Sequence, residues 1–185
     1  MICSRLQAPI EVSVRYLAPD TSPLAAWDDK APGSPTNYFA YTFFANLAHV
    51  FVDRETGRTT VHRLISSYDI GRVINRQTAE GQIEGGALMG IGFALTESFV
   101  ANGTHRTTSL AHCGIPRATD TPQLETVFVE TGDSVGPHGS KGLGEVAMIA
   151  VAPSITNAMC DAAGIRVRRL PATPKSVREL FAAQT

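Results

Sequence analysis

Residues 78–99 constrain the fold most strongly, because they combine a helical pattern with an unusual number of glycines. Apolar residues recur along this stretch at spacings of three and four, which predicts a helix. Leu88, Met89 and Phe93 make the opposite face apolar as well, so we expect the helix to be largely buried. Each glycine within it costs about 1 kcal/mol of helix stability relative to alanine. That cost indicates that another backbone or a ligand approaches the helix closely. The glycines are Gly85, Gly86, Gly90 and Gly92.

Alternating apolar and polar residues predict a β-hairpin before this helix. Its strands cover residues 45–53 and 58–71, and Gly57 supplies the positive φ of the turn between them. Further strands are predicted at residues 11–18, 124–131 and 165–170.

Two more helices are predicted from their end signals. Pro153 suits the first turn of a helix that ends at Ala163, with Gly164 as its C-terminal stop. A final helix begins with Thr173 as N-cap and Pro174 at the first helical position. Together the elements predict an α+β fold, with mixed strands and helices around the buried, glycine-rich helix.

The chain is expected to divide into an N-terminal arm, residues 1–37, and a lobe, residues 38–185. The arm contains the strand at residues 11–18 and continues in a stretch rich in Pro, Ser and Asp. A segment of this length without periodicity is more typical of an arm lying on a partner than of an internal loop. A flexible N-terminal extension explains the same composition.

Charge and cysteine content exclude several kinds of partner and site. The net charge is −1, so nothing indicates binding to nucleic acid or to an anionic membrane. The 3 cysteines are widely spaced and form no C-x-x-C pair. We therefore expect neither a zinc site nor a disulfide framework, and a reducing, cytoplasmic setting fits best. The longest mostly apolar stretch, residues 83–95, is too short to span a bilayer.

A second constraint is the sequence GPHGSKGLGE at residues 136–145, in which four glycines precede Glu145. It matches neither a phosphate-binding P-loop nor a dinucleotide-binding turn. It fits a loop whose backbone N–H groups approach a bulky ligand and which ends in one carboxylate. The apolar run behind Glu145 should raise the pKa of this carboxyl, so that it could take up a proton near neutral pH. Helix capping or pairing with an arginine also explains Glu145. Gln82 is a neutral polar residue near the start of the buried helix at residues 78–99, and a hydrogen bond to the backbone there would explain it.

Three motifs together resemble the C-terminal part of the molybdenum-binding portion of the xanthine dehydrogenase and aldehyde oxidase family. They are D-x-G-x-x-I-N at residues 69–75, G-Q-I-E-G-G at residues 81–86 and G-x-x-G-x-K-G-x-G-E at residues 136–145. Each motif is modest alone, but their order and spacing are specific. The resemblance covers nearly the whole chain.

The resemblance implies roles for particular residues. Glu145 corresponds to the active-site base of the family, and Gln82 corresponds to a residue that contacts the pterin. The loop that packs against the molybdopterin cofactor corresponds to Lys141, Gly142, Leu143 and Gly144. By the same analogy, residues 112–122 are expected near the substrate entrance. The motifs do not choose between cytosine-type and guanine-type forms of the cofactor.

The implied reaction is hydroxylation by water at an electron-poor carbon of a purine, another N-heterocycle or an aldehyde. Glu145 would deprotonate a molybdenum-bound hydroxyl, and electrons would leave through iron–sulfur clusters, usually to FAD. The family's upstream cofactor loops, iron–sulfur cysteine patterns and FAD region have no counterpart in these 185 residues. The resemblance therefore implies one subunit of a hetero-oligomeric enzyme, whose partners carry the upstream molybdopterin-binding part, the iron–sulfur clusters and FAD. A non-catalytic scaffold subunit and a truncated reading frame are the alternatives.

Overall fold

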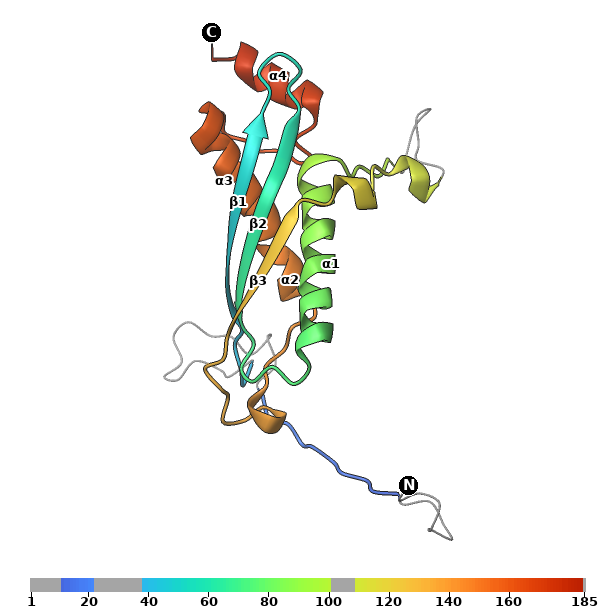
Figure 1. Cartoon of the computed structure of the whole chain (residues 1–185), viewed down its shortest axis with the longest axis vertical. Helices are drawn as coiled ribbons and strands as arrows, with labels where there is room; N and C mark the ends of the chain where they lie inside the picture. The colour runs from blue at the N-terminus through green and yellow to red at the C-terminus, as the bar shows by residue number, and fades with distance from the viewer. Residues whose placement is uncertain (1–10, 22–37, 101–108, 185) are drawn as a thin grey trace.

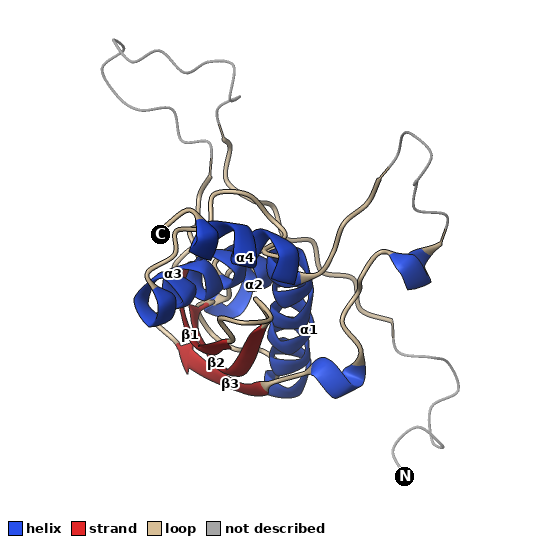
Figure 2. Cartoon of the chain, turned by 90° about the horizontal axis from the view of Figure 1, so that it is seen from above, coloured by secondary structure: helices blue, strands red, loops and turns tan. Residues whose placement is uncertain are grey.

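The computed structural model describes residues 11–21, 38–100 and 109–184, and these residues form a sheet layer and a helix layer. The strands are β1 (Phe43–Val52), β2 (Thr59–Asp69) and β3 (Gln123–Val129). The principal helices are α1 (Arg76–Leu95), α2 (Val146–Ile149), α3 (Val151–Ala163) and α4 (Pro174–Ala182). The first three of these helices lie on one face of the sheet (Figures 1 and 2).

The sheet has the order β1–β2–β3 and contains two kinds of strand pairing. β1 and β2 form the predicted antiparallel hairpin, and Gly57 in its connection has a φ of +73°. β3 confirms the strand predicted near residues 124–131. It pairs with β2 in parallel, which requires a crossover connection, and α1 lies in that connection.

Apolar side chains between the sheet and the helices form two clusters. The larger cluster includes Leu64, Ile91, Val151, Ile155 and Met159. The smaller cluster consists of Tyr68, Ile70, Ala79, Ile83 and Ala147. The smaller cluster joins the end of β2 to the first turns of α1 and to α2, and so supports the part of the molecule where the three sequence motifs meet.

Helix α1 is buried along one face only. A methyl group added at Gly86 would lie 2.5 Å from the Cβ of Ala147, and one at Gly90 would lie 2.5 Å from the Cβ of Val151. These two glycines therefore let α2 and α3 approach α1 closely. The prediction that the opposite face is also buried is wrong within this chain, because Met89 is 60% exposed and Phe93 is 54% exposed.

Two alanine substitutions in α1 should have opposite effects on stability. Gly90→Ala places a methyl group against Val151, so we expect it to lower the free energy of unfolding by about 1–3 kcal/mol. Gly85→Ala meets no heavy atom of the described residues within 4 Å, so better helix propensity should raise stability by up to about 1 kcal/mol. Thermal or denaturant unfolding of the two variants measures the difference. Equal destabilisation by both would contradict the packing described for Gly90.

The two helices after the glycine-rich loop begin and end largely as their sequence signals predict. α3 ends at Ala163, and Gly164 follows with a φ of +70°. Thr173 caps α4 by accepting a hydrogen bond from the backbone N–H of Ser176, and Pro174 is the first helical residue. Both predictions are confirmed.

Two predicted strands are wrong. Residues 165–170 form no strand, because their alternation serves packing instead: Ile165 is 1% exposed and Val167 packs against the larger cluster. Residues 11–21 are extended and exposed, without strand pairing. The hydroxyl of Tyr16 donates to the carbonyl of Val135 at 2.9 Å. Most of the predicted arm lies outside the described residues, so its contact with a partner stays a prediction.

Residues 146–163 have the length and the mean hydropathy, 1.4, of a membrane span. They form two helices, α2 and α3, rather than one regular helix. Val151, Ile155 and Met159 are each 0% exposed and belong to the larger cluster. The core therefore accounts for part of the apolar character of the stretch, of which 28% is buried, while Ile149 is 55% exposed.

Candidate functional site

The three sequence motifs come together at the end of β2. The backbone N–H of Lys141 donates to the carbonyl of Ile70 at 2.8 Å, and that of Arg72 donates to the carbonyl of Gly139 at 2.8 Å. Gly71 and Ser140 form an isolated antiparallel bridge. The glycine-rich loop at residues 136–145 is thereby fixed alongside residues 69–75.

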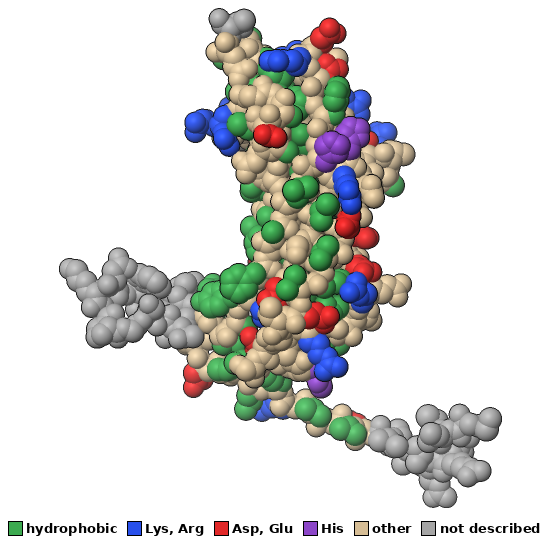
Figure 3. All heavy atoms as spheres, turned by 60° about the vertical axis from the view of Figure 1, so that its left-hand side comes forward, with side chains coloured by type: hydrophobic (Ala, Val, Ile, Leu, Met, Phe, Trp, Pro, Cys, Tyr) green, Lys and Arg blue, Asp and Glu red, His purple; other side chains and the backbone are tan. Residues whose placement is uncertain are grey.

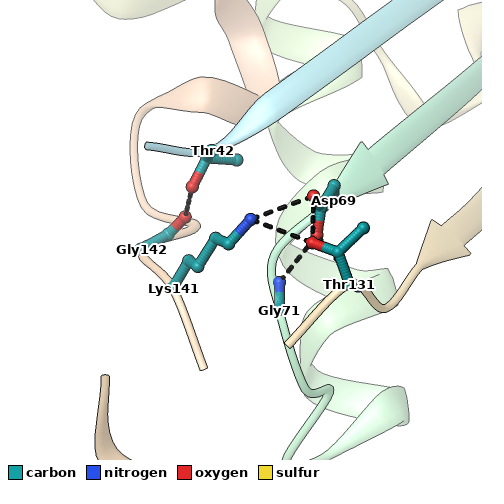
Figure 4. A network of polar contacts seen from close by, with 6 residues as sticks. All are labelled: Thr42, Asp69, Gly71, Thr131, Lys141 and Gly142. Carbon is teal, nitrogen blue, oxygen red and sulfur yellow. Dashed lines mark hydrogen bonds and ion pairs between the residues drawn. The ribbon is translucent and has the colours of Figure 1, made fainter. Parts of the chain in front are cut away.

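A buried ion pair joins the first motif to the loop (Figure 4). The Lys141 ammonium lies 2.9 Å from a carboxylate oxygen of Asp69, and the two side chains are 7% and 11% exposed. Asp69 also accepts hydrogen bonds from the Thr131 hydroxyl at 2.6 Å and from the backbone N–H of Gly71 at 3.1 Å. The Lys141 amine therefore binds Asp69 and fixes the loop to the end of β2.

The charge of Asp69 should make stability sensitive to acid. The Thr131 hydroxyl, and after it Lys141 and the N–H of Gly71, hold the pKa of Asp69 well below its ordinary value, while burial opposes them. Such a carboxyl stabilises the fold above its unfolded pKa, about 3.9, and this contribution is lost as the pH falls toward the folded value. We expect the difference in melting temperature between wild type and Asp69→Asn to shrink below about pH 4. A difference that stays constant from pH 7 to pH 3 would contradict a role for the charge.

Gln82 and Thr42 hold the part of the loop nearest Glu145. The side-chain amide nitrogen of Gln82 donates to the carbonyl of Gly144 at 2.8 Å, and the hydroxyl of Thr42 donates to the carbonyl of Gly142 at 2.7 Å. The backbone hydrogen bond that the sequence left open for Gln82 is therefore present. Gln82 is exposed, so the part of its side-chain amide that does not bond to Gly144 is accessible to a molecule outside the chain.

Glu145 lies directly before α2 and is exposed. Within the described parts of the chain, its side chain makes no helix-capping bond and no ion pair. Neither structural explanation that the sequence allowed for this carboxylate is therefore found there. The described residues leave the Glu145 carboxylate in contact with solvent. Only a partner chain or a ligand that covers it would bury this carboxylate.

Glycines near Glu145 leave open backbone surface. Methyl groups added at Gly81, Gly85, Gly142 or Gly144 would meet no heavy atom of the described residues within 4 Å. Gly81 and Gly85 are one helical turn apart on α1 and flank Gln82, whose amide contacts Gly144. Uncovered backbone of this kind fits close approach by a flat ligand such as a pterin.

A cavity of about 490 Å³ is lined in part by the glycine-rich loop. Its lining includes Tyr38, Phe39, Pro137 and Gly142. This volume is in the range of small-molecule sites. No group of three His, Cys, Asp or Glu side chains that could hold a metal is found in the part of the chain that the structure describes.

Residues 112–122 lie away from this site. The carbonyl of Cys113 accepts from Ser98, and a methyl group added at Gly92 would meet Pro116, so this segment packs at the C-terminal end of α1. Gln82 lies ten residues earlier on α1, which corresponds to about 15 Å along the helix. The expectation that residues 112–122 border the substrate entrance stays a prediction, because these contacts establish no path for a substrate.

Several residues of the site carried no individual signal in the sequence. Asp69 stood out only as part of a motif, whereas Thr42 and Thr131 resemble ordinary strand or loop residues. Their roles depend on contacts with residues far along the chain. The Thr42–Gly142 bond spans 100 positions, and the Thr131–Asp69 bond spans 62.

Known proteins resemble this chain in sequence and in fold. The molybdopterin cofactor-binding domain family matches residues 7–122. The xanthine dehydrogenase molybdenum-binding subunit of Escherichia coli O157:H7 is 37% identical over 142 residues, which are 75% of this chain and 19% of that protein. The 6-hydroxypseudooxynicotine dehydrogenase complex subunit gamma of Paenarthrobacter nicotinovorans is 34% identical over 179 residues, which are 90% of this chain and 22% of that protein.

A solved structure supports the same relationship. The aldehyde oxidoreductase of Desulfovibrio gigas superposes with a TM-score of 0.76 and 35% sequence identity, over 80% of this chain and 16% of its own. The chain thus spans about a fifth of the length of such relatives. Because the family match covers most of the chain and the fold agrees, this protein belongs to the molybdopterin cofactor-binding domain family, among the relatives of xanthine dehydrogenase molybdenum-binding subunits and aldehyde oxidoreductases.

Proposed function

We propose that this chain is part of the molybdenum-binding portion of a molybdenum hydroxylase and supplies its catalytic base, Glu145. The observation that carries the proposal is an exposed carboxylate without a partner among the described residues, beside a loop that is anchored at Lys141, Gly142 and Gly144. A scaffold subunit would need no free carboxylate at the end of an anchored loop. Turnover by the Glu145→Gln protein tests the proposal.

The cofactor would lie against the open backbone of Gly81, Gly85, Gly142 and Gly144. When bound, molybdopterin supplies the molybdenum that takes up two electrons during hydroxylation. Gln82 can present its exposed amide to the pterin while its nitrogen stays bonded to Gly144. Lys141 and Leu143 would shape the loop from within, since the Lys141 amine faces Asp69 and Leu143 packs against the smaller cluster.

Glu145 would act as proton acceptor for the attacking hydroxyl, which comes from water. A positioned carboxylate contributes about 10²–10⁴-fold to such a reaction. The relatives' names include xanthine, aldehyde and 6-hydroxypseudooxynicotine enzymes. We therefore propose a purine, another N-heterocycle or an aldehyde as the class of substrate.

Gln82→Ala should lower molybdenum content more than it lowers stability. The substitution removes one exposed hydrogen bond to Gly144, worth about 1 kcal/mol, and also removes the amide proposed to contact the pterin. Molybdenum per assembled protein and the melting temperature are the two measurements. Gln184→Ala is the matched control, because Gln184 is also exposed and its side-chain amide also donates to a glycine carbonyl, that of Gly164, outside the three motifs. Unchanged molybdenum content with a lower melting temperature would show that Gln82 only holds the loop.

Partner chains are proposed because large apolar side chains remain uncovered. On the outer face of the sheet, Phe43 is 67%, Leu47 is 62% and Phe51 is 58% exposed. Figure 3 shows hydrophobic side chains spaced along this side of the molecule. Aromatic side chains such as those of Phe43 and Phe51 are enriched in protein interfaces. We propose that a chain carrying the remaining molybdopterin-binding part covers it, that further subunits hold iron–sulfur clusters and FAD, and that the complex is cytoplasmic.

A further inference from the structure

Tyr68 is a fully buried side chain of β2 whose hydroxyl reaches the segment after Glu145. Its exposure is 0%, and its hydroxyl donates to the carbonyls of Ala147 at 3.0 Å and Val146 at 3.3 Å. The ring stacks on Phe44 with a centroid distance of 5.9 Å. Burial raises the pKa of Tyr68, so the hydroxyl keeps its proton and remains a donor.

The segment that Tyr68 holds has little stability of its own. α2 is a single turn, Val146–Ile149, and the side chain of Glu145 does not cap it. The turn is closed at its start by the N–H of Met148, which donates to the carbonyl of Glu145 at 3.2 Å. A single turn, which Ala150 separates from α3, contains few hydrogen bonds to offset the ordering of its backbone. Contacts from outside the turn must therefore fix it.

Tyr68 and its neighbour Asp69 hold the two sides of the Glu145 segment. Successive residues of a strand point to opposite faces, so Asp69 holds Lys141 while Tyr68 holds residues 146 and 147. From these contacts we propose that Tyr68 is a positioning residue for Glu145, which it acts on through the backbone of α2. The proposal rests on the proposed function of Glu145 as base.

The first test measures the backbone directly in the full chain. Tyr68→Phe removes only the hydroxyl and leaves the ring packing. Hydrogen exchange at the amide of Met148 should become faster by on the order of tenfold. Tyr16→Phe is the matched control, because it also removes a hydroxyl bonded to a backbone carbonyl, that of Val135, and it should leave Met148 unchanged. Unchanged exchange at Met148 in Tyr68→Phe would overturn the proposal.

The second test uses the assembled, molybdenum-loaded protein with xanthine, benzaldehyde and nicotinate as probes. Tyr68→Phe should lower kcat by about ten- to a hundredfold, with KM and molybdenum content unchanged, because a misplaced base affects the reacting step. Wild-type kcat in the variant would overturn the positioning role, as would a loss explained entirely by lost molybdenum. If the loaded wild type oxidises none of the probes, the proposed function fails for these substrates, and exchange at Met148 alone decides whether Tyr68 holds the turn.

Discussion

Glu145→Gln is expected to reduce turnover by about 10²–10⁴-fold while the protein assembles and keeps its molybdenum. Glutamine has nearly the same size as glutamate but cannot accept the proton. Because Glu145 is exposed and bonds to no side chain among the described residues, the substitution should cost little stability. The measurement is kcat per molybdenum atom, together with the melting temperature.

Glu179→Gln provides a matched control, since it changes an exposed glutamate on α4, outside the three motifs, to the same amide. It should leave turnover and molybdenum content unchanged. A Glu145→Gln protein that kept more than about a tenth of wild-type turnover per molybdenum would rule out the base assignment. Impaired assembly with normal turnover per site would instead indicate a structural role for Glu145.

Lys141→Met should destabilise the fold by about 3 kcal/mol, the second large effect expected. The side chain keeps its length, but the Asp69 carboxylate, 11% exposed, loses the cation 2.9 Å away. A buried charge without its partner is costly, even though Thr131 and Gly71 still donate to it. Unfolding by denaturant at pH 7 measures the loss.

Lys175→Met is the control, because Lys175 is exposed on α4 and should tolerate the change. The double variant Asp69→Asn with Lys141→Met should be less destabilised than the sum of the single changes, since each disrupts the same pair. Normal stability combined with lost molybdenum in Lys141→Met would show that Lys141 acts on the cofactor rather than as an anchor.

Local sequence signals predicted much of the secondary structure. The alternation around Gly57 predicted the β1–β2 hairpin, and Gly164, Thr173 and Pro174 predicted the ends of α3 and α4. These signals act over a few residues, because a positive φ, a cap or a fixed proline φ depends on the local backbone alone. The glycine-rich loop before Glu145 was also identifiable, since its motif lies within ten consecutive residues.

The tertiary structure decided which surfaces meet. The periodicity of α1 left its two apolar faces indistinguishable, and only packing of Gly86 and Gly90 on α2 and α3 shows which face is buried. The same holds for residues 165–170, whose alternation packs against the core instead of pairing as a strand.

The contacts that shape the candidate site are all long-range. Lys141 meets Asp69 across 72 positions, Gln82 meets Gly144 across 62, and Tyr68 meets Ala147 across 79. The motifs named the segments, but not that Lys141 turns inward or that Tyr68 reaches α2. A side chain's partner at that separation depends on how the sheet and helices pack, and a single sequence carries no local signal for such a choice.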